Sequence, residues 1–421
     1  MASKLFSLFQ NIKKIFLGNG AAQLIQFAFL PLSAFLYTPE QFGVFGVIQA
    51  YSTVITIFIS LQLYVAIPFE KDSNELTTLI HLNFKCILVT TLIFLIIYSL
   101  FLTDLFSILT IFLASIAAIT NSLRSLIVYS GDFSKLSVSY IIRALIIVIM
   151  QAALSASNSI NGLIYGLLVG EIIYGILLQY FIKNSNSNSN FGLSFLYNSS
   201  IKQLFFKYRA FTFYGSILEL TSVLIFYGPI IIFSYLFVES SNLIGQYSFI
   251  SRFIWPPIIL ISTSCANALY FHLTKIDDFE LKSLTLKFTK LSIILLLFIP
   301  FFAWLGEFLV NQFVTTENWN MIADFSYFVI VIALSFVASI YVRAIVRFKY
   351  LQKYQLLMDS IFLIAIVIML YKQKNTNSIN ILEILKFYSI SYFIYSIILI
   401  FSILVFIYRS EINKKINIKM D

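Results

Sequence analysis

The sequence predicts an all-α integral membrane protein with about twelve transmembrane helices arranged in two six-helix lobes. Of its 421 residues, 60% are hydrophobic and only 11% are charged, whereas soluble domains carry about 25% charged residues. Apolar runs recur along the chain, each close to the roughly 20 residues that a helix needs to cross a bilayer. A polar tract at 184–190, NSNSNSN, divides these runs into two groups.

The first half, residues 1–183, forms the predicted N-terminal lobe. It begins with a short basic segment, residues 1–14, whose apolar residues recur at helical spacing. We expect this segment to form an amphipathic helix on the inner membrane surface. The membrane spans should follow at 16–37, 42–66, 79–102, 104–129, 136–156 and 160–182.

The second half repeats this organisation after an Asn/Ser-rich connector, residues 184–209, which we place in the cytoplasm. Its uncharged polar composition is typical of a flexible linker. Residues 210–421 form the predicted C-terminal lobe, which ends in a basic cytoplasmic tail. Its spans are predicted at 210–236, 245–270, 284–306, 323–345, 353–371 and 384–408.

The distribution of charge predicts the orientation. With both termini in the cytoplasm, most of the 28 Lys and Arg residues fall on the inner side, and the outer loops carry mainly Glu and Asp. Cytoplasmic loops of membrane proteins show this positive bias. The net charge of +9 is therefore attributed to inner loops, and no nucleic-acid partner is expected.

An internal repeat relates the two halves. Gly43 aligns with Gly245 (245 − 43 = 202), and each glycine follows a short outer turn and opens an apolar helix. A second echo aligns Arg124 with Arg343, each near the inner end of a span. Because each half has an even number of spans, the halves would share one orientation, related by an axis along the membrane normal.

The stretch around the first repeat also carries a family resemblance. Residues 36–45 read LYTPEQFGVF, after a span that contains Gly18, Gln23 and Pro31. This resembles the L-Y-x-P-E-x-F-G-x-[FY] pattern of polysaccharide flippases of the Wzx type. These flippases belong to the multidrug/oligosaccharidyl-lipid/polysaccharide (MOP) exporter superfamily. The resemblance is sharpest here and extends, in topology, over the whole chain.

The resemblance implies a MATE-like fold and a flippase of undecaprenyl-pyrophosphate-linked oligosaccharides at the bacterial inner membrane. Such a protein serves O-antigen, lipopolysaccharide or capsule assembly and works by alternating access. It is a transporter and not an enzyme. Its partners would be the lipid-linked oligosaccharide, membrane lipids, and the polysaccharide polymerase and glycosyltransferases. No cofactor or metal is expected beyond a coupling proton or sodium ion.

Five ionisable residues lie inside predicted spans: Arg143, Glu171, Glu219, Arg252 and Asp359. A charge at mid-helix costs roughly 2.5–3.5 kcal/mol in a bilayer unless it is paired or hydrated. Similar depths predict two pairs, Arg143 with Glu171 and Glu219 with Arg252. Each pair either fixes helix packing or lines a cavity. Asp359 has no evident basic partner on a neighbouring helix.

A lipid pyrophosphate requires cationic donors, and the planar fork of Arg binds phosphate oxygens in pairs. Arg252 is the first candidate, beside Glu219, and Arg143 is a second. Arg124 and Arg343 are candidates for collecting the headgroup at the cytoplasmic mouth, although ordinary positive-inside anchoring is the simpler explanation for them.

The sugar requires polar walls. Span two presents a polar stripe at helical spacing, and span one adds further amides; the candidates are Gln23, Gln26, Gln49, Thr53 and Thr56. Trp255, beside Pro256 and Pro257, is a candidate for stacking on a sugar ring. The alternative is that these polar groups form helix–helix hydrogen bonds. Gly162, Gly166 and Gly170, at a spacing of four, predict a close-packing seam.

Acids in apolar surroundings bind a proton more readily, so Asp359, Glu219 and Glu171 are candidates for ion coupling. Two other functions compete. A multidrug or small-molecule antiporter of the same superfamily is expected to carry an acid in span one, and residues 18–37 contain none. A membrane polysaccharide polymerase or glycosyltransferase would need a sizeable catalytic loop, whereas the longest loop is the Asn/Ser connector.

Overall fold

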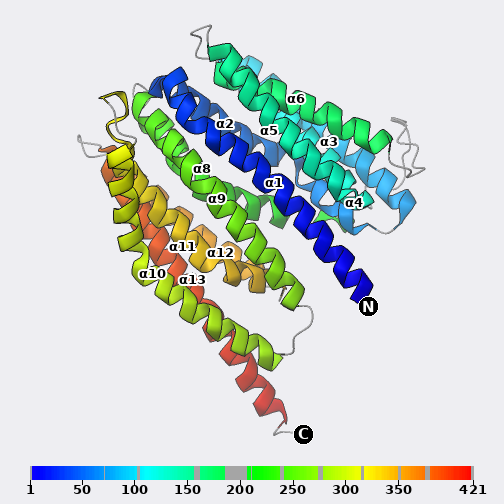
Figure 1. Ribbon diagram of the computed structural model, residues 1–421. Coiled ribbons are helices and arrows are strands. Elements are labelled where there is room, and N and C mark those ends of the chain that lie inside the picture. The colour runs from blue at the N-terminus through cyan, green and yellow to red at the C-terminus, as the bar shows by residue number, and fades with distance from the viewer. Residues whose placement is uncertain are drawn as a thin grey trace. The chain divides into compact units, whose positions relative to one another are not determined.

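In the computed structural model, the described chain consists of helices joined by short connections and contains no β-strand (Figure 1). The all-α membrane class predicted from composition is therefore confirmed. The residues that the structure describes are 2–70, 72–101, 105–155, 162–184, 206–209, 211–237, 241–273, 278–313, 317–348, 352–374 and 380–418.

The helices of the first half follow the predicted spans. They are α1 (Ala2–Leu36), α2 (Pro39–Ser60), α3 (Ser73–Phe101), α4 (Leu105–Ser130), α5 (Phe133–Ser155) and α6 (Gly162–Lys183). Helix α1 is continuous from Ala2, so the basic start forms its first turns and not a separate helix. The placement of these turns on the membrane surface stays a prediction.

The second span ends earlier than predicted. Helix α2 stops at Ser60, and the short 3₁₀ segment η1 (Leu63–Phe69) follows it. Leu61 and Gln62 adopt left-handed backbone conformations, with φ of 46° and 53°. Such angles are uncommon outside glycine, and the sequence has no Gly or Pro here that would predict the end of the helix.

The helices of the second half also match. They are η2 (Phe211–Gly215), α8 (Ser216–Leu236), α9 (Ser241–Leu273), α10 (Asp278–Phe313), η3 (Glu317–Trp319), α11 (Ile322–Phe348), α12 (Gln352–Lys374) and α13 (Ile381–Ile418). The element η2 is a π-helical turn that leads directly into α8.

Among the described residues, 11 helical stretches are long and apolar enough to cross a membrane. The chain is thus a multi-pass membrane protein. Helix α9 is not among these stretches although it has 33 residues, and it carries Gln246, Arg252 and the pair Pro256–Pro257. Its assignment as a span rests on its length and on its place in the predicted repeat.

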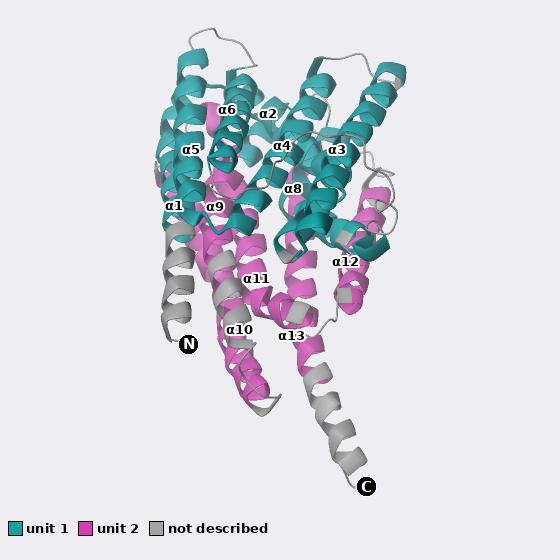
Figure 2. Cartoon of the chain, turned by 90° about the vertical axis from the view of Figure 1, so that its right-hand side faces the viewer, with its two compact units in different colours: residues 1–248 teal, residues 249–421 magenta. Residues whose placement is uncertain are grey.

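The chain divides into two compact units, residues 1–248 and 249–421 (Figure 2). Unit 1 contains α1 to α8 and the start of α9, and unit 2 contains the rest of α9 and α10 to α13. The predicted lobes and connector stay predictions, because most of the connector lies outside the described residues.

Within unit 1, the starts of α2 and α9 pack backbone against backbone. A Cβ atom added to Gly43 would overlap the carbonyl oxygen of Ser241, and one added to Gly245 would overlap that of Pro39. Only glycine fits at either position. The two glycines that the repeat aligns therefore lie against each other.

Two further contacts join residues that differ by the same offset. Asn242 Nδ2 donates a hydrogen bond of 2.5 Å to Glu40 Oε1 (242 − 40 = 202). A Cβ atom added to Gly46 would overlap Ser248 (248 − 46 = 202). Contacts between equivalent residues are what a local two-fold relation between the starts of these two helices produces.

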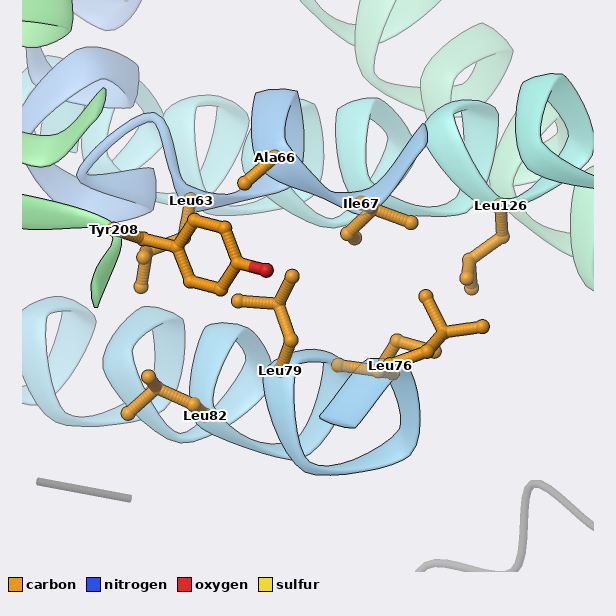
Figure 3. Packing of buried hydrophobic residues seen from close by; sticks show 9 residues of the cluster. Leu63, Ala66, Ile67, Leu76, Leu79, Leu82, Leu126 and Tyr208 are labelled. Carbon is orange, nitrogen blue, oxygen red and sulfur yellow. The ribbon is translucent and has the colours of Figure 1, made fainter. Parts of the chain in front are cut away.

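The inner end of α2, as the sequence orients it, is held by an apolar cluster around η1. Leu63, Ala66 and Ile67 of η1 pack with residues of α3 and α4 and with Tyr208 (Figure 3). The buried Glu70 accepts hydrogen bonds from the Tyr208 hydroxyl and from Lys207 Nζ, the latter at 2.9 Å. The segment 206–209 is thereby fixed to the end of α2.

Candidate functional site

A close contact between α5 and α6 positions the buried charges of unit 1. The residues of the predicted seam all lie against α5: Gly162, Gly166 and Gly170. A Cβ atom added to Gly170 would overlap Ile147. The predicted seam is confirmed. Since Glu171 follows Gly170 and Arg143 lies one turn before Ile147, the seam brings their side chains together.

Arg143 and Glu171 form the ion pair that the sequence predicts. Arg143 Nε donates to Glu171 Oε1 at 2.9 Å, and Nη2 donates to the same oxygen. The Glu171 side chain is 9% exposed, whereas that of Arg143 is 31% exposed. The carboxylate is therefore enclosed, while part of the Arg143 side chain remains accessible.

Two tyrosines surround this pair. Tyr140 of α5 and Tyr174 of α6 stack with ring centroids 6.1 Å apart and planes at 26°. Arg143 Cζ lies 5.5 Å from the centre of the Tyr174 ring, within the range of a cation–π contact. The Tyr174 hydroxyl is buried and makes no hydrogen bond. Buried polar groups are nearly always hydrogen-bonded, so the Tyr174 hydroxyl is available to donate a hydrogen bond to a ligand.

A second arginine completes the group. Arg124 of α4 hydrogen-bonds Tyr140 and interacts electrostatically with Tyr174. It also lies close enough to repel Arg143. We call Arg124, Tyr140, Arg143, Glu171 and Tyr174 the unit-1 cluster. The cluster contains two arginines and one glutamate.

Tyr64 of η1 connects this cluster to α8. Burial raises the pKa of Tyr64, the nearby Arg124 opposes this, and Glu219 adds to it. Glu219 is exposed and lies in the first turn of α8. Its predicted partner, Arg252, belongs to unit 2, and the pairing of the two stays a prediction.

Unit 2 contains a comparable group. Arg343 Nη2 of α11 lies 4.0 Å from Asp359 Oδ1 of α12, with side-chain exposures of 8% and 2%. Tyr395 of α13 donates its hydroxyl to Asp359 Oδ1 and accepts from Arg343 Nη2 at 3.4 Å. Tyr392 also interacts with Arg343 and Asp359. We call these residues the unit-2 cluster.

The expectation that Asp359 lacks a basic partner is wrong. Helix α11 contacts both α12 and α13, which places Arg343 beside the carboxylate. Arg343 is buried, and its predicted role in collecting the headgroup stays a prediction. The order of spans along the chain gave no information about which faces of these helices meet.

The hydroxyls of the predicted polar stripe on α2 bond to backbone carbonyls. Thr53 Oγ1 donates to Gln49 O at 2.7 Å, and Thr56 Oγ1 donates to Ser52 O at 2.7 Å. Thr56 also reaches Ala114 O of α4 at 3.2 Å, which supports the helix-packing alternative for this residue. Gln23 and Gln26 on α1 and Gln49 on α2 are half-buried, and their contact with a sugar stays a prediction.

Trp255 is 6% exposed and packs edge-on against Phe336, with ring centroids 6.2 Å apart. This is the environment of a core residue of unit 2. Its predicted stacking on a sugar stays a prediction.

Neither a protein-family profile nor a curated protein sequence matches the chain. Solved structures do match. An inward-facing multidrug resistance MATE transporter of the MOP superfamily is 13% identical, with a TM-score of 0.67 over 93% of this chain and 94% of that one. An outward-facing structure from the same family and superfamily is 12% identical, with a TM-score of 0.60 over 96% of each chain.

A MATE structure in the bent conformation gives a TM-score of 0.55 at 12% identity, over 97% of this chain and 96% of that one. The chain has the MATE fold. At these identities the likeness concerns the fold alone. It supports the MATE-like fold that the resemblance in residues 36–45 implies. The substrate has to be inferred from this chain's own residues.

Sequence reasoning missed the tyrosines of both clusters. Tyr140 lies three residues before Arg143 (143 − 140 = 3), and Tyr174 lies three residues after Glu171 (174 − 171 = 3). Residues three apart share a helix face, so a search for tyrosines at this spacing from each intramembrane charge would have found them.

Proposed function

We propose that this protein is a membrane transporter that flips oligosaccharides linked to a polyprenyl pyrophosphate across the bacterial inner membrane for O-antigen or capsule assembly. The MATE fold supports transport by alternating access. The two arginines of the unit-1 cluster, which lie near each other and both interact with Tyr174, are the observation that carries the choice of substrate.

An arginine inside a membrane bundle is costly, and such residues usually pair with an acid or mark a substrate path. Arg143, whose side chain is 31% exposed, and the nearby Arg124 offer forked donors that suit phosphate oxygens. The unbonded Tyr174 hydroxyl adds a third donor. Together these groups suit a polyanion held on its way through the membrane.

This geometry changes the ranking of the candidate residues. Arg124 and Arg143 become the proposed pyrophosphate contacts, because they lie near each other and both interact with Tyr174. Arg252 and Glu219 remain candidates for a later step. The coupling ion is proposed to be a proton or sodium, and both termini are proposed to lie in the cytoplasm.

A multidrug antiporter is the second candidate, because the matched structures are of multidrug resistance transporters. Cationic drugs would be repelled by the two arginines of the unit-1 cluster. Transport of such drugs would also require an acidic contact point that is not already bound to an arginine.

Deletion of the gene in its host tests the proposal. We expect surface polysaccharide to fall and lipid-linked repeat units to accumulate on the inner leaflet. Complementation with the wild type should restore export, and Arg143→Gln should not. Lys135→Gln is the matched control, since Lys135 lies on the same helix in a half-exposed pair with Asp132.

Unchanged surface polysaccharide without accumulated intermediates would exclude the flippase function. Sensitisation of the deletion strain to cationic drugs, with normal polysaccharide, would favour the multidrug antiporter.

A further inference from the structure

We propose that Tyr64 and Glu219 form a subsite that binds the first sugar of the substrate, next to the pyrophosphate held by the unit-1 cluster. The inference deepens the proposed function and rests on it, since it requires an anionic headgroup at Arg124. It also moves Glu219 from a later step to the binding of the headgroup. The ligand of this subsite is a pyranose ring joined directly to a phosphate.

Tyr64 lies beside Arg124. The left-handed residues Leu61 and Gln62 follow α2 and turn the chain into η1, which packs against α4. Tyr64 of η1 and Leu123 of α4 pack against the same apolar cluster, and Arg124 follows Leu123 in the sequence. The phenol interacts electrostatically with Arg124. Because Tyr64 is only half-buried, part of it remains accessible beside the arginine.

Glu219 reaches the same tyrosine from α8. It is exposed and interacts electrostatically with Tyr64. A Cβ atom added to Gly215 would lie 3.9 Å from Cβ of Gln62, so the start of α8 lies beside the start of η1. Glu219 is one turn further along the chain (219 − 215 = 4) and shares the helix face of Gly215. The carboxylate is therefore on the side of α8 that faces η1.

The segment before α8 is fixed to η1, which holds Glu219 in this place. Tyr208 lies among the residues of the apolar cluster around η1 (Figure 3). The Tyr208 hydroxyl and Lys207 Nζ both donate to the buried Glu70, which follows η1. Because η2 leads directly into α8, these contacts keep Glu219 near Tyr64.

The two charged groups near Tyr64 select opposite ends of a sugar phosphate. A guanidinium only donates hydrogen bonds, and an ionised carboxylate only accepts them. Phosphate oxygens are acceptors, so they bind Arg124 and are repelled by Glu219. Sugar hydroxyls are donors that suit Glu219, and the face of the Tyr64 ring packs against the C–H groups of a pyranose. The three side chains therefore suit a phosphate and its sugar in one orientation.

Two other roles for Glu219 make a different prediction. Glu219 could pair with Arg252, as the sequence predicts, or only weaken the field of Arg124. Removal of Glu219 would then change the affinity for every pyrophosphate diester by the same factor. A sugar subsite instead changes the affinity only for diesters that carry the sugar. The ratio of two affinities separates these roles.

Calorimetry on the full-length protein in detergent measures this ratio. The sugar probe is citronellyl pyrophosphate-linked N-acetylglucosamine, and the methyl probe carries a methyl group in place of the sugar. Both probes are pyrophosphate diesters of the same charge, so their attraction to the arginines is the same. We expect the wild type to bind the sugar probe about thirtyfold more tightly than the methyl probe, through the packed ring and a hydrogen bond to the carboxylate.

The variants assign this preference to the two residues. Tyr64→Ala and Glu219→Ala should each lower the ratio about fivefold, because one removes the packed ring and the other removes the acceptor. Tyr64→Phe keeps the ring and should keep the ratio. Asp132→Asn is the control for Glu219, because it removes a half-exposed acid from the turn before α5 and should leave the ratio unchanged.

The outcomes distinguish the inference from the proposed function. If the folded wild type binds both probes equally, the sugar subsite is overturned while the anion site stands. If it binds neither probe, the anion site itself fails. An unchanged ratio in Glu219→Ala would overturn the role of Glu219. If Tyr64→Ala does not fold, the wild-type ratio and the variant of the exposed Glu219 still decide.

Discussion

The unit-1 and unit-2 clusters use the same residue types for what we infer to be different purposes. Each combines an arginine aligned by the internal repeat, Arg124 or Arg343, with two tyrosines and one carboxylate. In unit 2 the charges balance, and both partners are less than 10% exposed. In unit 1 a second arginine joins the pair, and the Arg143 side chain is 31% exposed.

The difference shows that a buried charge does not by itself mark a substrate site. A balanced pair sealed inside a bundle contributes mainly to the specificity of helix packing, because its desolvation offsets most of its attraction. Exposure and the number of arginines, and not residue type, separate the two clusters.

The largest expected effect is on the stability of unit 2. Asp359→Ala leaves Arg343 buried without its acid, and loss of one partner of a buried pair costs about 3–5 kcal/mol. Glu171→Ala should cost less, because Arg143 can turn to its accessible side. Melting temperatures of the two purified variants measure this difference. Equal losses would remove the distinction between the clusters.

A double substitution sharpens the same comparison. Arg343→Met combined with Asp359→Leu replaces the balanced pair by apolar side chains, and such replacements are often neutral or stabilising. We expect the double variant to recover most of the melting temperature lost by Asp359→Ala and to keep transport. Transport lost by a stable double variant would give the unit-2 cluster a direct role in transport.

The glycine seam should have a smaller effect on stability and a specific one on the site. Gly170→Ala overlaps Ile147, and overpacking of this kind costs about 1–3 kcal/mol. It should also separate Arg143 from Glu171 and thereby weaken the binding of a polyprenyl pyrophosphate-linked sugar, the probe, measured by calorimetry. Gly175→Ala on the same helix is the control, since its Cβ would meet only Thr120 at 3.4 Å. Equal probe affinity in both variants would show that the seam does not position the site.

The smallest loss of stability is expected for the exposed Lys207 of unit 1. Lys207→Met removes the hydrogen bonds to Glu70 and Glu75 and should lower the melting temperature less than Gly170→Ala does. These bonds raise the pKa of Lys207 above 10.5. The contribution of these hydrogen bonds to the stability of the fold is present below pH 10.5, and it is lost as the pH rises through the raised pKa of Lys207. The difference in melting temperature should therefore be constant from pH 6 to 9 and fade only above the ordinary lysine pKa of 10.5. A difference that already fades at pH 8 would contradict the assignment.

Much of the fold was predictable because membrane spans are long apolar runs of a length that the bilayer dictates. The repeat was predictable at Gly43 and Gly245, where close approach of two backbones admits no side chain. The end of α2 was not, since Leu61 and Gln62 adopt left-handed conformations that their sequence does not favour.

The candidate site was predictable only in part, even where consecutive helices pack against each other. Arg143 and Glu171 lie on consecutive helices at similar depth, so their pairing could be inferred. Arg343 and Asp359 also lie on consecutive helices, but their meeting depends on which helix faces turn inward. Hydropathy gives no information on this, because lipid and a neighbouring helix are equally apolar.

The central claim is that the unit-1 cluster moves an anionic lipid-linked sugar, and flipping in proteoliposomes tests it most directly. The substrates are a fluorescent polyprenyl pyrophosphate-linked sugar and the same sugar linked to the neutral polyprenol. We predict that the wild type and Lys135→Gln move the pyrophosphate lipid and not the neutral one, and that Arg143→Gln slows this at least tenfold. Equal transport of the neutral lipid, or wild-type rates in Arg143→Gln, would contradict the account.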